Sequence, residues 1–174
     1  DDGNGADRTV MAVTLPSAVM PLQEVILDVE WNATIPKPIA RTGWIGNYFF
    51  FGQWFPKVGV LEDQGWNTHQ FHFPTEFFSD YGVYDVRMTV PASFVVGGSG
   101  KQIEQTTNSD GTVTHRYRGE DIHDFGWVAS PRFVDLHRTF THPTLPRVDM
   151  RLLLLDERRD QEERYFTIIA DRSE

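Results

Sequence analysis

Apolar and polar side chains alternate with a period of two along much of this chain, the spacing typical of β-strands. In the range Val25–Trp31 the odd-numbered positions are all apolar, and positions 28 and 30 are acidic. In the range Val83–Val90 the even-numbered positions are apolar, and Pro91 ends the pattern. Because a helical period of 3.6 would scatter these positions around the axis, both ranges are predicted to be strands.

Shorter ranges of similar character extend the prediction over most of the chain. Prolines recur at intervals that leave little room for long helices. Asn108–Gly111 supplies a turn between two polar, alternating arms and predicts a hairpin tip. Further strands are predicted at Val10–Leu15, Phe49–Phe51, Val58–Leu61, Phe94–Ser99, Thr112–Arg118, Gly126–Ala129 and Val148–Leu154.

The end of the chain breaks this pattern and predicts a helix. Asp156 is expected to cap a helix that runs toward Ile169. We therefore expect an all-β, mostly antiparallel sandwich of many short strands over residues 1–155, followed by a helical tail, 156–174, that begins another domain. Of the 23 aromatic residues, 12 cluster between Trp44 and Phe78, which predicts a sandwich core with some rings at a domain interface.

Charge and hydropathy exclude two classes of partner. The chain has 25 acidic and 16 basic residues, a net charge of −9, whereas nucleic-acid binding depends on cationic side chains. The longest apolar runs, Tyr48–Phe51 and Leu152–Leu155, are far shorter than the roughly 20 residues that span a bilayer. We therefore expect neither nucleic-acid binding nor membrane insertion.

The compartment is left open by the composition. The chain has no cysteine, which excludes disulfides and thiolate metal sites and fits a reducing cytoplasm or a bacterial envelope. Asp1–Gly5 has no basic and apolar sequence typical of a signal peptide, although the chain could be cut from a longer exported precursor. An envelope or extracellular location is favoured over the cytoplasm.

Few side chains have the spacing that catalysis or metal binding requires. His69 and His72, followed by Glu76, form the only local cluster of metal-ligand types, but residues three apart on a strand face opposite ways. The range Gly97–Gly100 lacks the Lys-Ser/Thr of a phosphate-binding loop, so it predicts a bulge or turn. His123 precedes an aspartate, but the chain has no serine in the Gly-x-Ser-x-Gly turn of a catalytic triad, so His123 is interpreted as structural.

Three segments resemble the N-terminal domain of zinc aminopeptidases of the membrane alanyl aminopeptidase (gluzincin) class, in its bacterial form. They are Gly46–Val58 (GNYFFFGQWFPKV), Asp80–Pro91 (DYGVYDVRMTVP) and Ile122–Pro131 (IHDFGWVASP). The resemblance extends from about Val10 to Leu155. It implies a saddle-shaped, mostly antiparallel β domain that precedes a thermolysin-like catalytic domain of the same polypeptide.

The resemblance also implies how chemistry is divided between the two domains. In the family the zinc ligands, the catalytic glutamate and the Gly-x-Met-Glu-Asn motif lie in the catalytic domain, and this chain contains no His-Glu-x-x-His. The chain is thus expected to be non-catalytic alone, with no cofactor of its own and with zinc in the catalytic domain. Its expected partners are that domain and the N-terminus of a peptide substrate.

Two residues are candidates for substrate contact on the same basis. The family holds the substrate's α-amine through a Thr-Gln-x-Glu or Thr-Gln-x-Gln stretch, and Gln53 matches its first glutamine. Phe55 stands where the amine-binding residue lies in the family. Glu76, a carboxylate among aromatic residues, is the substitute candidate for pairing with an ammonium group.

Two alternatives remain open. The aromatic density and the lack of catalytic motifs also fit a free-standing all-β module that binds peptide or carbohydrate. Paired carboxylates such as Asp121 and Asp124 fit a glycoside hydrolase, whose chemistry needs two such groups.

Overall fold

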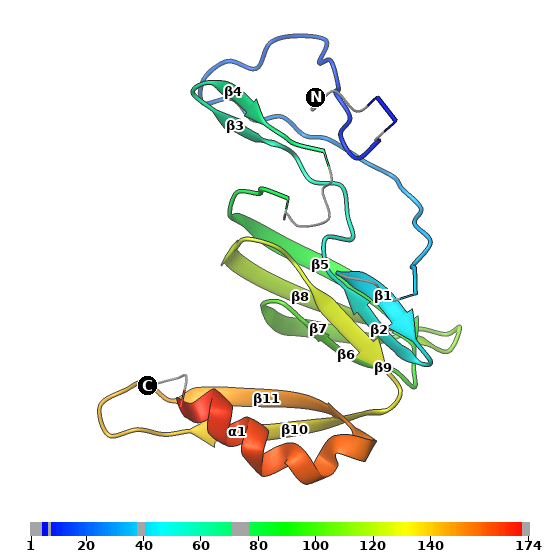
Figure 1. Cartoon of the computed structure of the whole chain (residues 1–174), viewed down its shortest axis with the longest axis vertical. Helices are drawn as coiled ribbons and strands as arrows, with labels where there is room; N and C mark the ends of the chain where they lie inside the picture. The colour runs from blue at the N-terminus through cyan, green and yellow to red at the C-terminus, as the bar shows by residue number, and fades with distance from the viewer. Residues whose placement is uncertain (1–4, 7, 38–40, 71–76, 172–174) are drawn as a thin grey trace.

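Antiparallel sheets and hairpins are the main regular structure of the described chain, which confirms the expected all-β, sandwich-like fold (Figure 1). The computed structural model describes residues 5–6, 8–37, 41–70 and 77–171. The four-stranded sheet has the order β1-β2-β9-β6, with β1 (Thr42–Ile45), β2 (Tyr48–Phe51), β9 (Trp127–Ser130) and β6 (Val95–Gly98). The three-stranded sheet has the order β5-β8-β7, with β5 (Gly82–Pro91), β8 (Thr112–Ile122) and β7 (Lys101–Thr107).

Two hairpins and a helix complete the described elements. The hairpin of β3 (Val60–Glu62) and β4 (Gly65–Asn67) lies at one end of the long axis, near the N-terminal segment (Figure 1). At the other end lies the hairpin of β10 (Phe133–Phe140) and β11 (Val148–Leu155), followed by the 3₁₀-helix η1 (Asp156–Gln161) and the α-helix α1 (Glu162–Asp171). No helix of the described residues is long and apolar enough to cross a membrane.

The core lies between the two larger sheets. Its buried members come from β5, β6, β8 and β9 and the loop before β9, and are Met88, Val90, Val96, Tyr117, Phe125 and Ala129. Burial alternates along β5 as its sequence pattern predicts, with the even-numbered side chains inside. Gly98 packs tightly here, because a Cβ at that position would lie 3.2 Å from the Phe125 ring.

The hairpin of β10 and β11 has two different faces. Its apolar face holds Phe140 and Met150, which pack with Phe166 of α1 in a second buried cluster. The guanidinium of Arg138 lies 4.3 Å from the centre of the Phe166 ring and pairs with the carboxylate of Glu162. The helix is therefore held by apolar burial and by charge, while the polar face of the hairpin contacts the two larger sheets.

The sequence pattern locates most strands, and the predicted hairpin at Asn108–Gly111 joins β7 to β8 as expected. Gly111 has a φ of +83°, which explains why a glycine occupies this position. The predicted ranges that begin at Phe49, Phe94, Thr112, Gly126 and Val148 are confirmed as β2, β6, β8, β9 and β11. The range Val58–Leu61 overlaps β3 at its C-terminal end.

Two predicted strands are wrong, because Val25–Trp31 and Val10–Leu15 have no strand assignment. Their apolar side chains are substantially exposed, as in Val25 at 51% and Ile26 at 84%. Alternation gives a segment two distinct faces, but a strand also needs a hydrogen-bonded neighbour, and no described strand pairs with either range.

The start of the C-terminal helix also differs from its prediction. Asp156 is not the cap: the N-cap of η1 is Leu155, without a side-chain hydrogen bond, and Asp156 is the first residue of that 3₁₀ turn. The sequence pattern does not predict the strands β1, β4, β7 and β10, since short or mostly polar segments such as β7 carry little apolar alternation. The proposed domain division after residue 155 stays a prediction.

Candidate functional site

The three segments that carry the family resemblance meet in one place in the fold. The first and third segments contribute β2 and β9, which are paired. Across this pair the Phe51 and Trp127 rings stack at 3.8 Å. The Trp54 indole N–H donates a hydrogen bond of 2.9 Å to the Phe125 carbonyl. The loop after β2 is thus tied to the loop that precedes β9.

The second segment joins this cluster through Tyr84 of β5. Its ring lies 5.8 Å from that of Phe55 and 6.1 Å from that of Phe125. Burial, followed by the negative charge of Asp124, raises the pKa of the Tyr84 phenol. Asp124 itself forms an ion pair of 3.0 Å with Lys57, whose side chain is 16% exposed. Aromatic packing and one shielded ion pair therefore join all three segments.

Gln53 lies at the edge of this cluster with a strained backbone. Its φ of +52° is in the left-handed region, which costs a non-glycine residue roughly 1–2 kcal/mol. The residues before and after Gln53 are both held by hydrogen bonds. The Thr42 hydroxyl is hydrogen-bonded to the backbone of Gly52, and the Trp54 indole is hydrogen-bonded to the Phe125 carbonyl. Such strain persists only where surrounding contacts enforce it, and it is enriched at functional sites.

The Gln53 side chain lines a cavity of about 340 Å³, which we call the Gln53 pocket. Its apolar walls come mainly from aromatic and aliphatic residues on either side of the β3–β4 hairpin, and its polar groups include an amide, an ammonium and an imidazole. The lining residues include Gln53, Phe55, Lys57, Val58, Asn67, His69, Phe77 and Phe78. An apolar pocket with a few polar groups is the usual form of a site for a small ligand or a peptide end.

The structure describes one of the two predicted substrate-contact residues. Glu76 lies outside the described residues, as does His72, so no geometry is assigned to either. His69 lines the Gln53 pocket, with Nδ1 2.9 Å from the Gln70 carbonyl oxygen and its ring stacked on Phe77. Among the described residues, no three His, Asp or Glu side chains gather in a way that could hold a metal ion.

The other sequence candidates have structural contacts. Asp124 is committed to its ion pair with Lys57, and Asp121 is an exposed residue with a φ of +54°. His123 is exposed and its ring packs edge-on against Tyr81. Of the range Gly97–Gly100, predicted to be a bulge or turn, Gly97 and Gly98 belong to β6, and Ser99 and Gly100 form the turn that joins β6 to β7.

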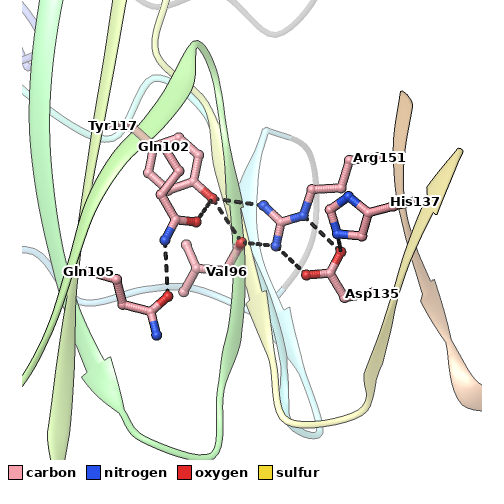
Figure 2. Close-up of polar contacts among 7 residues, drawn as sticks. All are labelled: Val96, Gln102, Gln105, Tyr117, Asp135, His137 and Arg151. Carbon is pink, nitrogen blue, oxygen red and sulfur yellow. Dashed lines mark hydrogen bonds and ion pairs between the residues drawn. The ribbon is translucent and has the colours of Figure 1, made fainter. Parts of the chain in front are cut away.

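A second polar site, which sequence reasoning missed, lies between β8 and the polar face of the β10–β11 hairpin (Figure 2). The Arg151 guanidinium donates hydrogen bonds of 2.8 and 2.7 Å to the two oxygens of Asp135. It donates further bonds to the Tyr117 hydroxyl at 2.9 Å and to the Val96 carbonyl at 3.0 Å. Arg151 thereby connects the hairpin to both larger sheets.

The network extends from Tyr117 along β7. The Tyr117 hydroxyl oxygen lies 3.0 Å from the amide oxygen of Gln102, whose nitrogen donates to Gln105 at 3.0 Å. On the hairpin, His137 Nε2 lies 3.0 Å from Asp135. Burial opposes ionisation of Asp135, but the hydrogen bonds and charge of Arg151 outweigh it and lower the pKa of the carboxyl group.

A sequence signal for this site exists. Asp135 and His137 on β10, and Asp149 and Arg151 on β11, are polar pairs two residues apart in strands that also carry apolar residues. That spacing places each pair on one strand face.

Comparison of the chain with protein-family models, curated proteins and solved structures finds no match.

Proposed function

We propose that this chain is the non-catalytic β domain of a zinc aminopeptidase-like metallopeptidase. In this role it packs on the catalytic domain of the same polypeptide and closes one side of the substrate cleft. The observation that carries the proposal is Gln53, whose strained backbone is held at the wall of a pocket. The contacts that hold it come from the segments that resemble the family.

The chemistry of the Gln53 pocket supports contact with a peptide terminus. A glutamine amide has both a donor and an acceptor, so it can bind the ammonium group or the first peptide group of a substrate. Aromatic walls exclude water and strengthen such polar contacts. A wall that fixes the substrate terminus raises the effective concentration of the reacting bond at the catalytic centre. Zinc and its activated water belong to the catalytic domain in this proposal.

The exposed N-terminal segment supports packing on a neighbouring domain. Residues 8–37 contain no helix or strand and expose twelve large apolar side chains. These are Val10, Met11, Val13, Leu15, Val19, Met20, Leu22, Val25, Ile26, Leu27, Val29 and Trp31. Extended apolar surface of this kind is typical of protein interfaces, and we assign it to the catalytic domain.

Kinetics of the natural polypeptide that contains this chain test the proposal. We expect the polypeptide to hydrolyse alanine p-nitroanilide, and Gln53→Ala to raise KM about tenfold with kcat nearly unchanged, because one hydrogen bond to a charged group is lost. Gln161→Ala, in η1 at the other end of the fold, is the matched control and should leave KM unchanged. Absence of hydrolysis by the unsubstituted polypeptide, or equal KM values for the two variants, would contradict the proposal.

The second candidate function is a free-standing module that binds peptide or carbohydrate. It is favoured by the polar cavity of about 690 Å³ beside the Arg151 network, which is large enough for such a ligand. A peptide and glycan array probed with the 174-residue chain tests it. Saturable binding that Gln105→Ala abolishes would support this function. Failure of the chain to bind any peptide or glycan on the array would contradict it.

A further inference from the structure

The polar cavity between β8 and the β10–β11 hairpin has a volume of about 690 Å³. It lies apart from the Gln53 pocket, since the two share no lining residue. A sandwich interior is normally filled by apolar side chains, yet one side of this space carries charged and amide groups from β7, β10 and β11, and the other is lined by apolar residues and glycines of β6. A ligand of this cavity would therefore bind independently of the proposed aminopeptidase role.

His115 of β8 is the most unusual group in the wall. Its side chain lines the cavity and is 6% exposed, yet neither ring nitrogen has a hydrogen-bond partner among the described residues. A buried polar group without a partner costs about 1–3 kcal/mol, so native structures rarely retain one without a role. Burial, together with the nearby charge of Arg151, lowers the pKa of His115, which keeps the ring neutral at pH 7.

Two side chains of β7 have hydrogen-bond donors without an acceptor among the described residues. Lys101 lines the cavity, and its ammonium forms no ion pair with the described residues. Gln105 lies opposite His115 in the β7–β8 register, and its amide oxygen is occupied by Gln102. Its amide nitrogen donates no hydrogen bond within the described residues and remains available as a donor.

The acidic groups of the cavity are already paired. Asp135 accepts hydrogen bonds from Arg151 and lies against His137. Asp149 accepts from Thr139 and Arg147. The unmatched groups of the wall are therefore donors from the β7–β8 side, which is the composition that recognises an anion.

We propose that this cavity binds a small oxyanion, a carboxylate or a phosphate group, held by Lys101 and Gln105 beside the ring of His115. The anion would give the ammonium and the amide an acceptor, and its negative charge would lie beside the buried imidazole. The charged or titratable groups around His115 come from β7, β10 and β11. They are Lys101, Asp135, His137, Asp149 and Arg151.

Binding of the anion must be linked to protonation. A negative charge beside His115 favours the imidazolium form and raises its pKa from the lowered value of the empty cavity. The chain thus takes up a proton as the anion binds, and its affinity for the anion increases as the pH falls below neutrality. A site built from Lys101 and Gln105 alone would lack this dependence.

Titration of the isotope-labelled full chain by NMR tests the proposal, with acetate and dimethyl phosphate, which stay ionised over the pH range used, as separate probes at equal ionic strength. We expect a saturable shift of the His115 ring signals, and binding several-fold tighter at about pH 6 than at about pH 7.5 for the same probe. The probe that binds more tightly identifies the carboxylate or the phosphate group as the natural chemistry.

Variants of exposed residues separate this site from general charge attraction. Lys101→Gln should weaken binding about fivefold or more, because it removes the full positive charge of the described wall that forms no ion pair. Lys37→Gln, which removes an exposed cation outside the cavity, is the matched control. Both variants must retain the amide spectrum of the unsubstituted chain. An unmoved His115 signal with both probes, or equal weakening by the two variants, would overturn the proposal.

Discussion

The Tyr117 hydroxyl shows how one buried atom connects three parts of this fold. It lies within hydrogen-bond distance of the Val96 carbonyl, the Gln102 amide and the Arg151 guanidinium, while its ring is 2% exposed. Buried polar groups stabilise a protein only when their partners are present, because an unpaired group keeps its desolvation cost. The stability of this centre therefore depends on all members of the network.

Tyr117→Phe should lower the free energy of unfolding by about 1–3 kcal/mol, because the Val96 carbonyl and Arg151 each lose a buried contact. Urea denaturation monitored by tryptophan fluorescence measures this change. Tyr165→Phe, which removes a hydroxyl from a 41% exposed residue of α1, is the control and should change stability by less than about 0.5 kcal/mol. Equal effects of the two substitutions would contradict the network.

His115 should make stability depend on pH. Its pKa is lowered in the fold, whereas in the unfolded chain it titrates near the ordinary value of about 6.5. Between these two values the unfolded state binds more protons, so stability is fully present above about pH 6.5 and falls as the pH decreases through that window.

His115→Gln should remove this slope, which is at most about 1.4 kcal/mol per pH unit. Urea denaturation at several pH values, in buffers without carboxylate or phosphate, measures it. His123→Gln, at an exposed position, should keep the slope of the unsubstituted chain. A His115→Gln variant with the same slope would show that His115 is not the group responsible.

At the scale of elements, two segments share the same alternating pattern, but only one of them forms a strand. Both Val25–Trp31 and β5 alternate apolar and polar residues, but only β5 has a neighbour, β8, with which it pairs over nearly its whole length. The sequence therefore predicts which faces are apolar, whereas the existence of a strand depends on partners distant along the chain. The same limit explains why the pattern does not predict β10, with its mixed polar face.

The helix α1 should behave as a separately docked element. Phe166→Ala removes the ring that is buried against Phe140 and Met150, at a cost of about 3 kcal/mol or more. We expect faster hydrogen exchange in α1 and in the β10–β11 hairpin, with β5 and β8 still protected.

Hydrogen exchange followed by mass spectrometry measures this difference. Tyr165→Ala, on the more exposed side of the same helix, should leave the exchange of α1 nearly unchanged. A uniform loss of protection throughout the chain in Phe166→Ala would contradict separate docking of the helix.

At the scale of the whole molecule, the two candidate sites differ in how far the sequence predicts them. A motif identifies Gln53, and the structure explains its setting through contacts among the three resembling segments. No motif identifies the polar cavity, because its contacts join residues far apart along the chain, such as Arg151 and Tyr117, separated by 34 positions. Glu76, the other motif-based candidate, stays a prediction.

The measurement that tests the central claim most directly is the zinc content of the natural polypeptide that contains this chain, together with the reading frame that encodes it. The account predicts that the frame continues beyond Glu174 into a His-Glu-x-x-His helix with a glutamate farther on as third ligand, and that the purified polypeptide holds about one zinc ion. A polypeptide without that motif and without zinc would contradict the assignment of this chain as one wall of an aminopeptidase cleft.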